Sequence, residues 1–152
     1  PNWIRVTDFP NAESVKPGTT TANAPLLTAT PPFAFNGSLE NKDEPAFFRF
    51  TAKKDQNLEF TVFARRLGSP VDSVLTVFDV AGKPIATNTG WNTPANGAAI
   101  AAAAVTVGAF PFATTSADSA LLLTLDPGTY TIQVKGSAET TGRAIIEVYE
   151  VP

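Results

Sequence analysis

The sequence predicts an all-β protein, an antiparallel β-sandwich of jelly-roll type into which one short alanine-rich helix is inserted. Two patterns indicate this fold: short stretches in which apolar residues alternate with polar ones, and turn-forming Pro, Gly, Asn and Asp residues between those stretches. The composition agrees, because 43% hydrophobic residues and eleven phenylalanines in 152 residues suffice for the packed core of one domain.

The N-terminal fifth divides into two parts before the sandwich begins. Residues 1–10 contain an alternating stretch, Trp3 to Phe9, that ends at Pro10 and is expected to form a strand or arm. Residues 11–32 are rich in Pro, Thr, Ala and Asn without a period, which predicts an extended linker. The sandwich domain is expected over residues 33–152.

Strand signals are dense from Phe33 onward, and alternation assigns a face to each side chain. A turn is expected at Asn36-Gly37, a strand over residues 73–79, and a short edge strand over residues 85–87. Phe33 and Phe35 alternate along the first strand. In the next strand Phe48 and Phe50 are expected on one face, with Phe47 and Arg49 on the other. The predicted inward-facing side chains of the following strand are Leu58, Phe60 and Val62, set against Glu59, Thr61 and Phe63.

The C-terminal stretch "DPGTYTIQVKGSAETTGRAIIEVYEV" alternates on both sides of a polar turn and therefore predicts a β-hairpin. It follows a strand expected over residues 120–125. Its predicted inward-facing side chains are Tyr130, Ile132, Val134, Ala144, Ile146 and Val148.

A helix is expected within residues 93–108, between the two groups of strands. Alanine is the best helix former, and Gly108 provides a C-terminal stop. Ile100, Ala103, Ala104 and Val107 share one face. The helix carries no charge, so we expect little of it to be exposed. It either lies across one end of the sandwich or packs against a neighbouring subunit.

Two stretches together resemble the bacterial pre-peptidase C-terminal (PPC-like) domain family. They are "DEPAFFRFTAKKDQNLEFTVFARRLGSPVDSVLTVFDVAGKPIATN" and "DPGTYTIQVKG". The resemblance implies a non-catalytic β-sandwich module on a secreted or cell-surface bacterial protein. Some members bind calcium or attach their parent protein to polymers. This chain departs from the family at the calcium positions, with Asp43-Glu44-Pro45 in the acidic turn and Asn88-Thr89-Gly90 further on.

The composition excludes several kinds of chemistry. Without histidine or cysteine the chain has no Ser-His-Asp triad, thiol nucleophile or ordinary zinc site, and we expect no enzymatic activity. A net charge of −3 with scattered basic residues argues against nucleic acid, and no apolar run is long enough to span a membrane. The chain starts at Pro1 and contains no methionine, so we expect a processed, exported, extracellular protein.

Four candidate sites follow from individual residues. Asp43 and Glu44 form an acidic turn that suits calcium or, more remotely, a glycosidase, although a solvated turn explains it as well. Trp91 beside Asn88 and Asn92 suits a sugar ring, or fills the edge of the core. Asn36 begins an N-glycosylation pattern that also fits a turn. Arg65-Arg66 suits an acidic partner or protects a strand edge.

Two hypotheses for function remain. The first is an extracellular structural module that self-assembles, as the subunit of a bacterial surface filament, by exchange of its N-terminal strand between copies. Its assembly contacts would be Trp3, Ile4, Val6, Phe9, Ile100 and Val107. The second is an accessory domain that binds carbohydrate or matrix polysaccharide through Trp91 and its amide neighbours.

Overall fold

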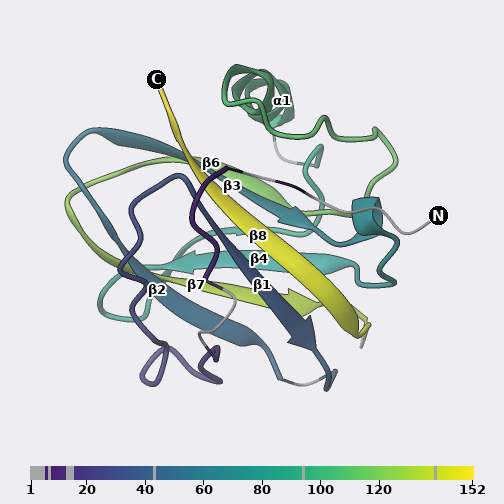
Figure 1. Cartoon of the computed structure of the whole chain (residues 1–152), viewed down its shortest axis with the longest axis horizontal. Coiled ribbons are helices and arrows are strands. Elements are labelled where there is room, and N and C mark those ends of the chain that lie inside the picture. Colours follow the sequence, from purple (N-terminus) through teal and green to yellow (C-terminus); the bar gives the residue numbers. More distant parts are fainter. Residues whose placement is uncertain (1–5, 7, 13–15, 43, 94, 139) are drawn as a thin grey trace.

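The computed structural model describes residues 6, 8–12, 16–42, 44–93, 95–138 and 140–152. The strands are β1 (Phe33–Leu39), β2 (Ala46–Ala52), β3 (Gln56–Phe63), β4 (Ser73–Phe78), β5 (Pro84–Asn88), β6 (Ala120–Leu125), β7 (Gly128–Gly136) and β8 (Gly142–Val151). They form two four-stranded antiparallel sheets, sheet A in the order β1-β8-β3-β6 and sheet B in the order β2-β7-β4-β5 (Figure 1). This is the jelly-roll arrangement, so the predicted fold class is confirmed.

The core lies between the two sheets and is built mainly from phenylalanine. Phe35 of β1 stacks on Phe48 of β2 with ring centroids 4.7 Å apart, and Phe50 of β2 meets Phe60 of β3 edge-on at 5.5 Å. The predicted inward-facing side chains of β3 and β8 and Ile132 and Val134 of β7 are buried in this core, and Tyr130 packs partly buried against it. The alternating phenylalanines of β1 and the Phe48–Phe50 face of β2 lie in the same core. Alternation along the strands therefore assigned the inner faces correctly.

Two local predictions are wrong. The C-terminal stretch is not a hairpin: β7 pairs with β2 and β4 in sheet B, whereas β8 pairs with β1 and β3 in sheet A. Consecutive strands alternate in the same way whether they pair with each other or cross between sheets, so the pattern could not separate the two cases. Nor is there a turn at Asn36-Gly37, because β1 continues through it, with Asn36 opposite Ile145 and Gly37 opposite Ala144.

The segment before β1 has no regular strand in its described residues, yet it lies against the sandwich. Residues 10–12 run parallel to β1, where Ala12 N donates to Ala34 O and Ala34 N donates to Pro10 O, both at 2.9 Å. Further on, Gly18 exchanges two backbone hydrogen bonds with Phe47 of β2. The segment therefore covers the β1 and β2 edges on one side of the sandwich.

Buried side chains fix the later part of this segment. Ala24 and Leu27 are buried, and Leu27 packs on the main core. Arg49 Nε of β2 donates to Ala24 O at 2.8 Å. Residues 18–27 are thus a packed covering of sheet B, whereas the expected strand from Trp3 onward lies mostly outside the described residues.

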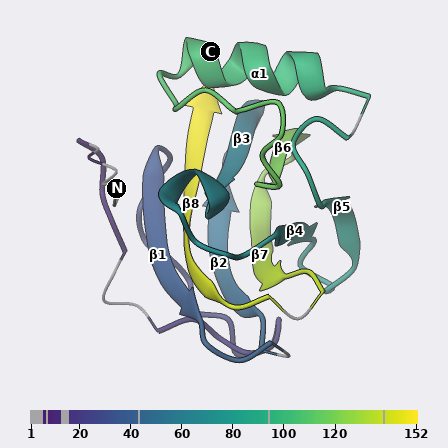
Figure 2. The ribbon, with the colours of Figure 1, turned by 90° about the vertical axis from the view of Figure 1, so that its right-hand side faces the viewer.

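The inserted helix α1 (Gly97–Thr106) confirms the sequence prediction, and Gly108 just beyond it has the left-handed φ of 69° that favours glycine. The helix lies across one end of the strands, where it contacts β6 and β3 (Figure 2). Ile100, Ala103 and Ala104 are buried. The opposite face, which includes Ala98, Ala102 and Val105, is exposed, so the expectation that little of α1 meets solvent is wrong.

The outer face of sheet A is covered rather than solvated. Glu59, Thr61 and Phe63 point away from the core, as alternation predicts, but all three are completely buried. Phe63 contacts Phe110 of the segment after α1, and Phe9 meets Tyr149 of β8 edge-on at 5.4 Å. This second layer positions the candidate site described next.

Candidate functional site

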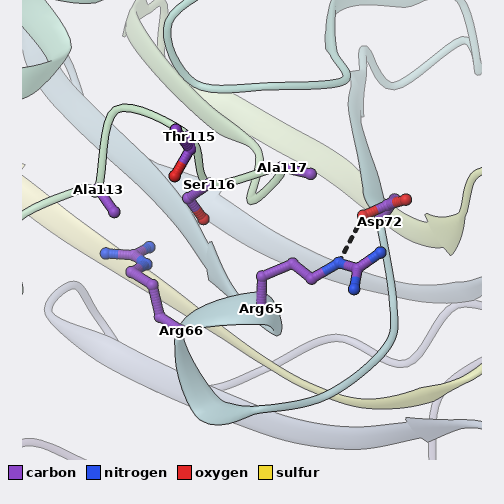
Figure 3. A pocket seen from close by; sticks show the side chains of 7 residues that line it. All are labelled: Arg65, Arg66, Asp72, Ala113, Thr115, Ser116 and Ala117. Atoms are coloured by element: carbon purple, nitrogen blue, oxygen red, sulfur yellow. Dashed lines mark hydrogen bonds and ion pairs between the residues drawn. The ribbon is translucent and has the colours of Figure 1, made fainter.

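A surface cleft opens where the short helix η1 (Arg65–Leu67) faces the segment that leads into β6. It has a volume of about 410 Å³ and combines two arginines, one aspartate and two hydroxyl-bearing residues. The side chains that line it are Arg65, Arg66, Asp72, Ala113, Thr115, Ser116 and Ala117 (Figure 3).

Arg66 forms the inner wall of this cleft and is bound on every side. Its Nε donates to Asp118 Oδ2 at 2.8 Å, and its Nη1 and Nη2 donate to the carbonyl oxygens of Phe110 and Val62 at 2.9 and 3.0 Å. Its guanidinium also lies over the Phe63 and Phe112 rings, 3.9 and 4.2 Å from their centroids. Burial lowers the pKa of Arg66, and the hydrogen bond to Asp118 opposes that change.

Asp118 is the anchor of this arrangement. It is completely buried and accepts hydrogen bonds from the backbone N–H groups of Ala64, Arg65 and Arg66 at 2.9, 2.8 and 3.2 Å. A carboxylate with these donors and a guanidinium partner is fully satisfied. The pair therefore fixes η1 to the segment before β6, and most of its donors and acceptors are committed within the protein.

Arg65 and Asp72 form the outer wall. Arg65 Nε donates to Asp72 Oδ1 at 2.6 Å, and both side chains are substantially exposed (Figure 3). The hydrogen bond from Arg65 is the main reason that the pKa of Asp72 lies below its ordinary value. The accessible part of the cleft thus offers a neutral ion pair and two hydroxyls, which suit polar contacts with a partner.

Two buried carboxylates lie behind the cleft, on the outer face of sheet A. Glu59 stands opposite Tyr149, and Thr61 stands opposite Glu147 in the next rung. Tyr149 Oη donates to Glu147 Oε2, while neither carboxylate oxygen of Glu59 has a hydrogen-bond partner. Burial raises the pKa of Glu59 to about 7, with Arg66 opposing the rise and Glu147 adding to it.

The predicted sugar platform is not exposed. Trp91 is only 8% exposed, stacks on Phe112 at 4.8 Å and donates from Nε1 to Ala113 O at 3.0 Å. Asn88 is also buried, and its side chain holds the turn at Gly90 and the start of β6 at Ala120. Only Asn92 is exposed, and it donates to Thr114 O. Trp91 fills the edge of the core, the alternative that the sequence had left open.

The other predicted sites are dispersed. Asp43 lies outside the described residues, and Glu44 accepts a hydrogen bond from Asn41 at 2.7 Å. Among the described residues no three Asp or Glu side chains gather as a metal ion requires. Asn36 lies within a strand instead of the surface turn that the glycosylation pattern suggested.

The predicted assembly residues also lie in different parts of the structure. Trp3 and Ile4 lie outside the described residues, and Val6 is exposed. Phe9 is partly buried against Tyr149, and Val107 packs beside it. Ile100 is buried against Trp91 and Ala120 of its own chain.

Sequence reasoning missed the polar layer formed by Arg66, Asp118, Glu59 and Glu147. Arg65-Arg66 suggested either an acidic partner or an edge-strand charge, and neither interpretation fits the buried Arg66. One signal was available, because Asp118 lies two residues before the apolar run of β6 and a lone acid there suggests a backbone cap. The burial of Glu59 had no such signal, since its cover is distant in sequence.

Comparisons with known proteins agree with the architecture. No protein-family model and no curated protein sequence matches the chain. Among solved structures, the pre-peptidase C-terminal domain of a collagenase from Bacillus anthracis is similar, with a TM-score of 0.52 and 11% identity. The match covers 96% of this chain and 99% of that one. The chain thus has the fold of a pre-peptidase C-terminal domain, as the resemblance in its sequence implied.

Proposed function

We propose that this protein is a non-catalytic accessory module of a secreted protein, and that it acts by association with other protein surfaces. The observation that carries the proposal is that the charged groups of the cleft at η1 are already paired within the protein. Its inner arginine, Arg66, and the buried Asp118 are committed to each other and to backbone groups. Its outer pair, Arg65 and Asp72, is mutually neutralised. Such a surface suits docking better than acid–base or nucleophilic chemistry.

Two further findings support this role. The fold is that of a domain attached to a collagenase, and the resemblance in sequence implies a non-catalytic module on an exported protein. In the described part of the chain no helix is both long and apolar enough to cross a membrane. An extracellular location is part of the proposal.

The finer form of the proposal is self-association by exchange of the N-terminal segment between copies, as in a surface filament. Two hydrogen bonds with Ala34 and the packing of Phe9 on Tyr149 connect residues 9–12 to sheet A. Such contacts are identical whether the segment belongs to the same chain or to a neighbour, which makes exchange inexpensive. Repeated head-to-tail exchange would build a filament.

Paired cysteines test the exchange directly, because the chain has none of its own. Asn11 and Ala34 stand opposite each other in the parallel bridge, so Asn11→Cys combined with Ala34→Cys places two thiols within disulfide reach. Exchange predicts covalent dimers and longer ladders on a non-reducing gel after mild oxidation at high protein concentration. A monomer with an internal disulfide at every concentration would overturn the exchange.

Deletion supplies the second test. Light scattering of the full chain should show oligomers that are lost when residues 1–10 are removed, while circular dichroism remains that of the folded sandwich. Val80→Ser is a matched control, because Val80 is the most exposed large apolar side chain of the described residues and lies far from β1. Oligomers that persist after the deletion would show that association does not depend on residues 1–10.

A further inference from the structure

A second, smaller cleft lies on the outer face of sheet B, away from the site described above. It has a volume of about 220 Å³, and its floor is made by β2 and β7, where Arg49 stands opposite Thr131 and Thr51 stands opposite Thr129. Its rims are the turns at residues 19–23 and 79–83. The residues that line it are Thr21, Ala22, Arg49, Asp79, Val80, Ala81, Gly82, Thr129 and Thr131.

Both rims are held in place by their own side chains. Asn23 Oδ1 accepts hydrogen bonds from the N–H groups of Thr19 and Thr20 at 2.9 and 2.8 Å. Asp79 Oδ1 accepts from the N–H groups of Ala81 and Lys83, both at 2.9 Å. The cleft is therefore bounded by ordered turns, which lowers the entropic cost of binding there.

Arg49 is the unusual group in this cleft. Its Nε donates to Ala24 O at 2.8 Å, which orients the guanidinium, but no carboxylate of the described residues forms an ion pair with it. The side chain is partly buried, in contrast to an ordinary solvated surface arginine. Its terminal Nη groups remain available as donors in the fork geometry that matches a carboxylate.

The remaining lining groups select the rest of the ligand. Thr21, Thr129 and Thr131 carry hydroxyls that both donate and accept, and Asp79 carries a carboxylate that accepts. This set complements an anion flanked by hydroxyl groups. The volume of this cleft is below the usual range for drug-sized ligands, and it suits one small polar unit of a ligand.

We propose that this cleft binds a carboxylate-bearing sugar, a uronic acid unit of an acidic polysaccharide, with its carboxylate on Arg49 and its hydroxyls on the threonines and Asp79. The proposal does not rest on self-association, because the residues that line this cleft belong to β2, β7 and two turns, whereas the exchange proposal rests on residues 9–12 against sheet A. A peptide carboxylate would use Arg49 as well, and its backbone N–H groups would reach the same acceptors, so N-acetylglycine in the test below distinguishes a peptide from a sugar.

The test uses the full chain and free ligands. Glucuronic acid and galacturonic acid are titrated into ¹⁵N-labelled protein, with glucose, acetate and N-acetylglycine as comparisons. The expected result is saturable shifts of the Arg49, Thr129 and Thr131 amides with at least one uronic acid, and weaker or absent shifts with the other three. Equal binding of acetate or N-acetylglycine, or no saturable binding of either uronic acid, would overturn the proposal.

Variants separate the site from the fold. Arg49→Gln should weaken uronic acid binding about tenfold or more, because a charge-assisted hydrogen bond is lost. Thr131→Val, which leaves Arg49 and the Ala24 contact intact, should weaken it less. Arg65→Gln changes the arginine of the other cleft and should bind as the unmodified chain does. Loss of binding in Arg65→Gln, or full binding in both Arg49→Gln and Thr131→Val, would contradict the assignment.

Discussion

Arg66 and Asp118 form a salt bridge of 2.8 Å beneath the surface, with the aspartate completely buried and the arginine between two phenylalanine rings. The pair connects η1 with the segment that follows α1. Arg65, its neighbour in sequence, makes a shorter contact with Asp72, but at an exposed position. Burial, and not distance, decides which of these two ion pairs matters for stability.

The first prediction concerns this difference. Arg66→Ala should lower the free energy of unfolding by about 3–5 kcal/mol, because Asp118 would remain as a buried charge without its cation. Arg65→Gln should lower it by less than about 1 kcal/mol, as for other exposed pairs. Urea unfolding of the two variants measures both values. Similar losses of unfolding free energy in Arg65→Gln and Arg66→Ala would show that burial does not make the Arg66–Asp118 pair more important for stability.

The second prediction is a pH dependence from Glu59. Its pKa is about 7 in the folded chain against an ordinary value of 4.5, so the folded protein binds more protons than the unfolded chain between these values. The free energy of unfolding should therefore fall as pH rises from about 4.5 to 7, by about 3 kcal/mol, and this group adds no further change outside that range.

Glu59→Gln should flatten that slope, because an amide does not ionise. The other charged and titratable groups around Glu59 are Glu147 and Tyr149 on β8, Arg66 on η1 and Asp118 before β6, while α1 above them has none. Glu44→Gln, at an exposed position, is the control. An unchanged slope in Glu59→Gln would assign the pH dependence to another group.

The inner layer of this protein could be predicted from sequence, because alternation in a strand is a local property. Phe48 and Phe50 share one face, as expected, and Ile146 and Val148 are inward-facing, as expected. The pairing of strands is not a local property. Nothing in residues 126–151 distinguishes a hairpin from two strands in opposite sheets, since pairing depends on segments such as β1 and β2 that are distant in the sequence.

The surroundings of single residues were harder to predict for a related reason. Glu59 was expected on the face of β3 opposite the inward set, and Trp91 in a loop. Both are buried, and their cover is visible only in three dimensions. Arg49 was expected on the face of β2 opposite Phe48 and Phe50, but its cleft depends on two turns from distant parts of the chain.

The third prediction tests the N-terminal covering of sheet B. A Cβ at Gly18 would lie 2.7 Å from Ala24 Cα and from Asn23 O, both backbone atoms, so Gly18→Ala must displace the turn. We expect a loss of roughly 1–3 kcal/mol. Faster hydrogen exchange should appear at Phe47 and Leu27. Their N–H groups donate to Gly18 O and Arg49 O and connect the N-terminal segment to β2. In Gly128→Ala the nearest atom is 3.7 Å away, and exchange at these amides should not change.

The fourth prediction separates a structural tryptophan from a sugar platform. Trp91→Ala removes a buried ring that stacks on Phe112 and bonds to Ala113, so it should cost about 3–5 kcal/mol. Trp91→Phe keeps part of the stacking and should cost less. Neither change should alter uronic acid binding at temperatures where the variant is folded. Trp91 packs on Ala120 of β6 in sheet A, whereas the Arg49 cleft is on the outer face of sheet B. Denaturation curves measure the stability of each variant, and the uronic acid titration measures its binding. A Trp91→Ala variant that is as stable as the unmodified chain but no longer binds the sugar would show that Trp91 belongs to the ligand site.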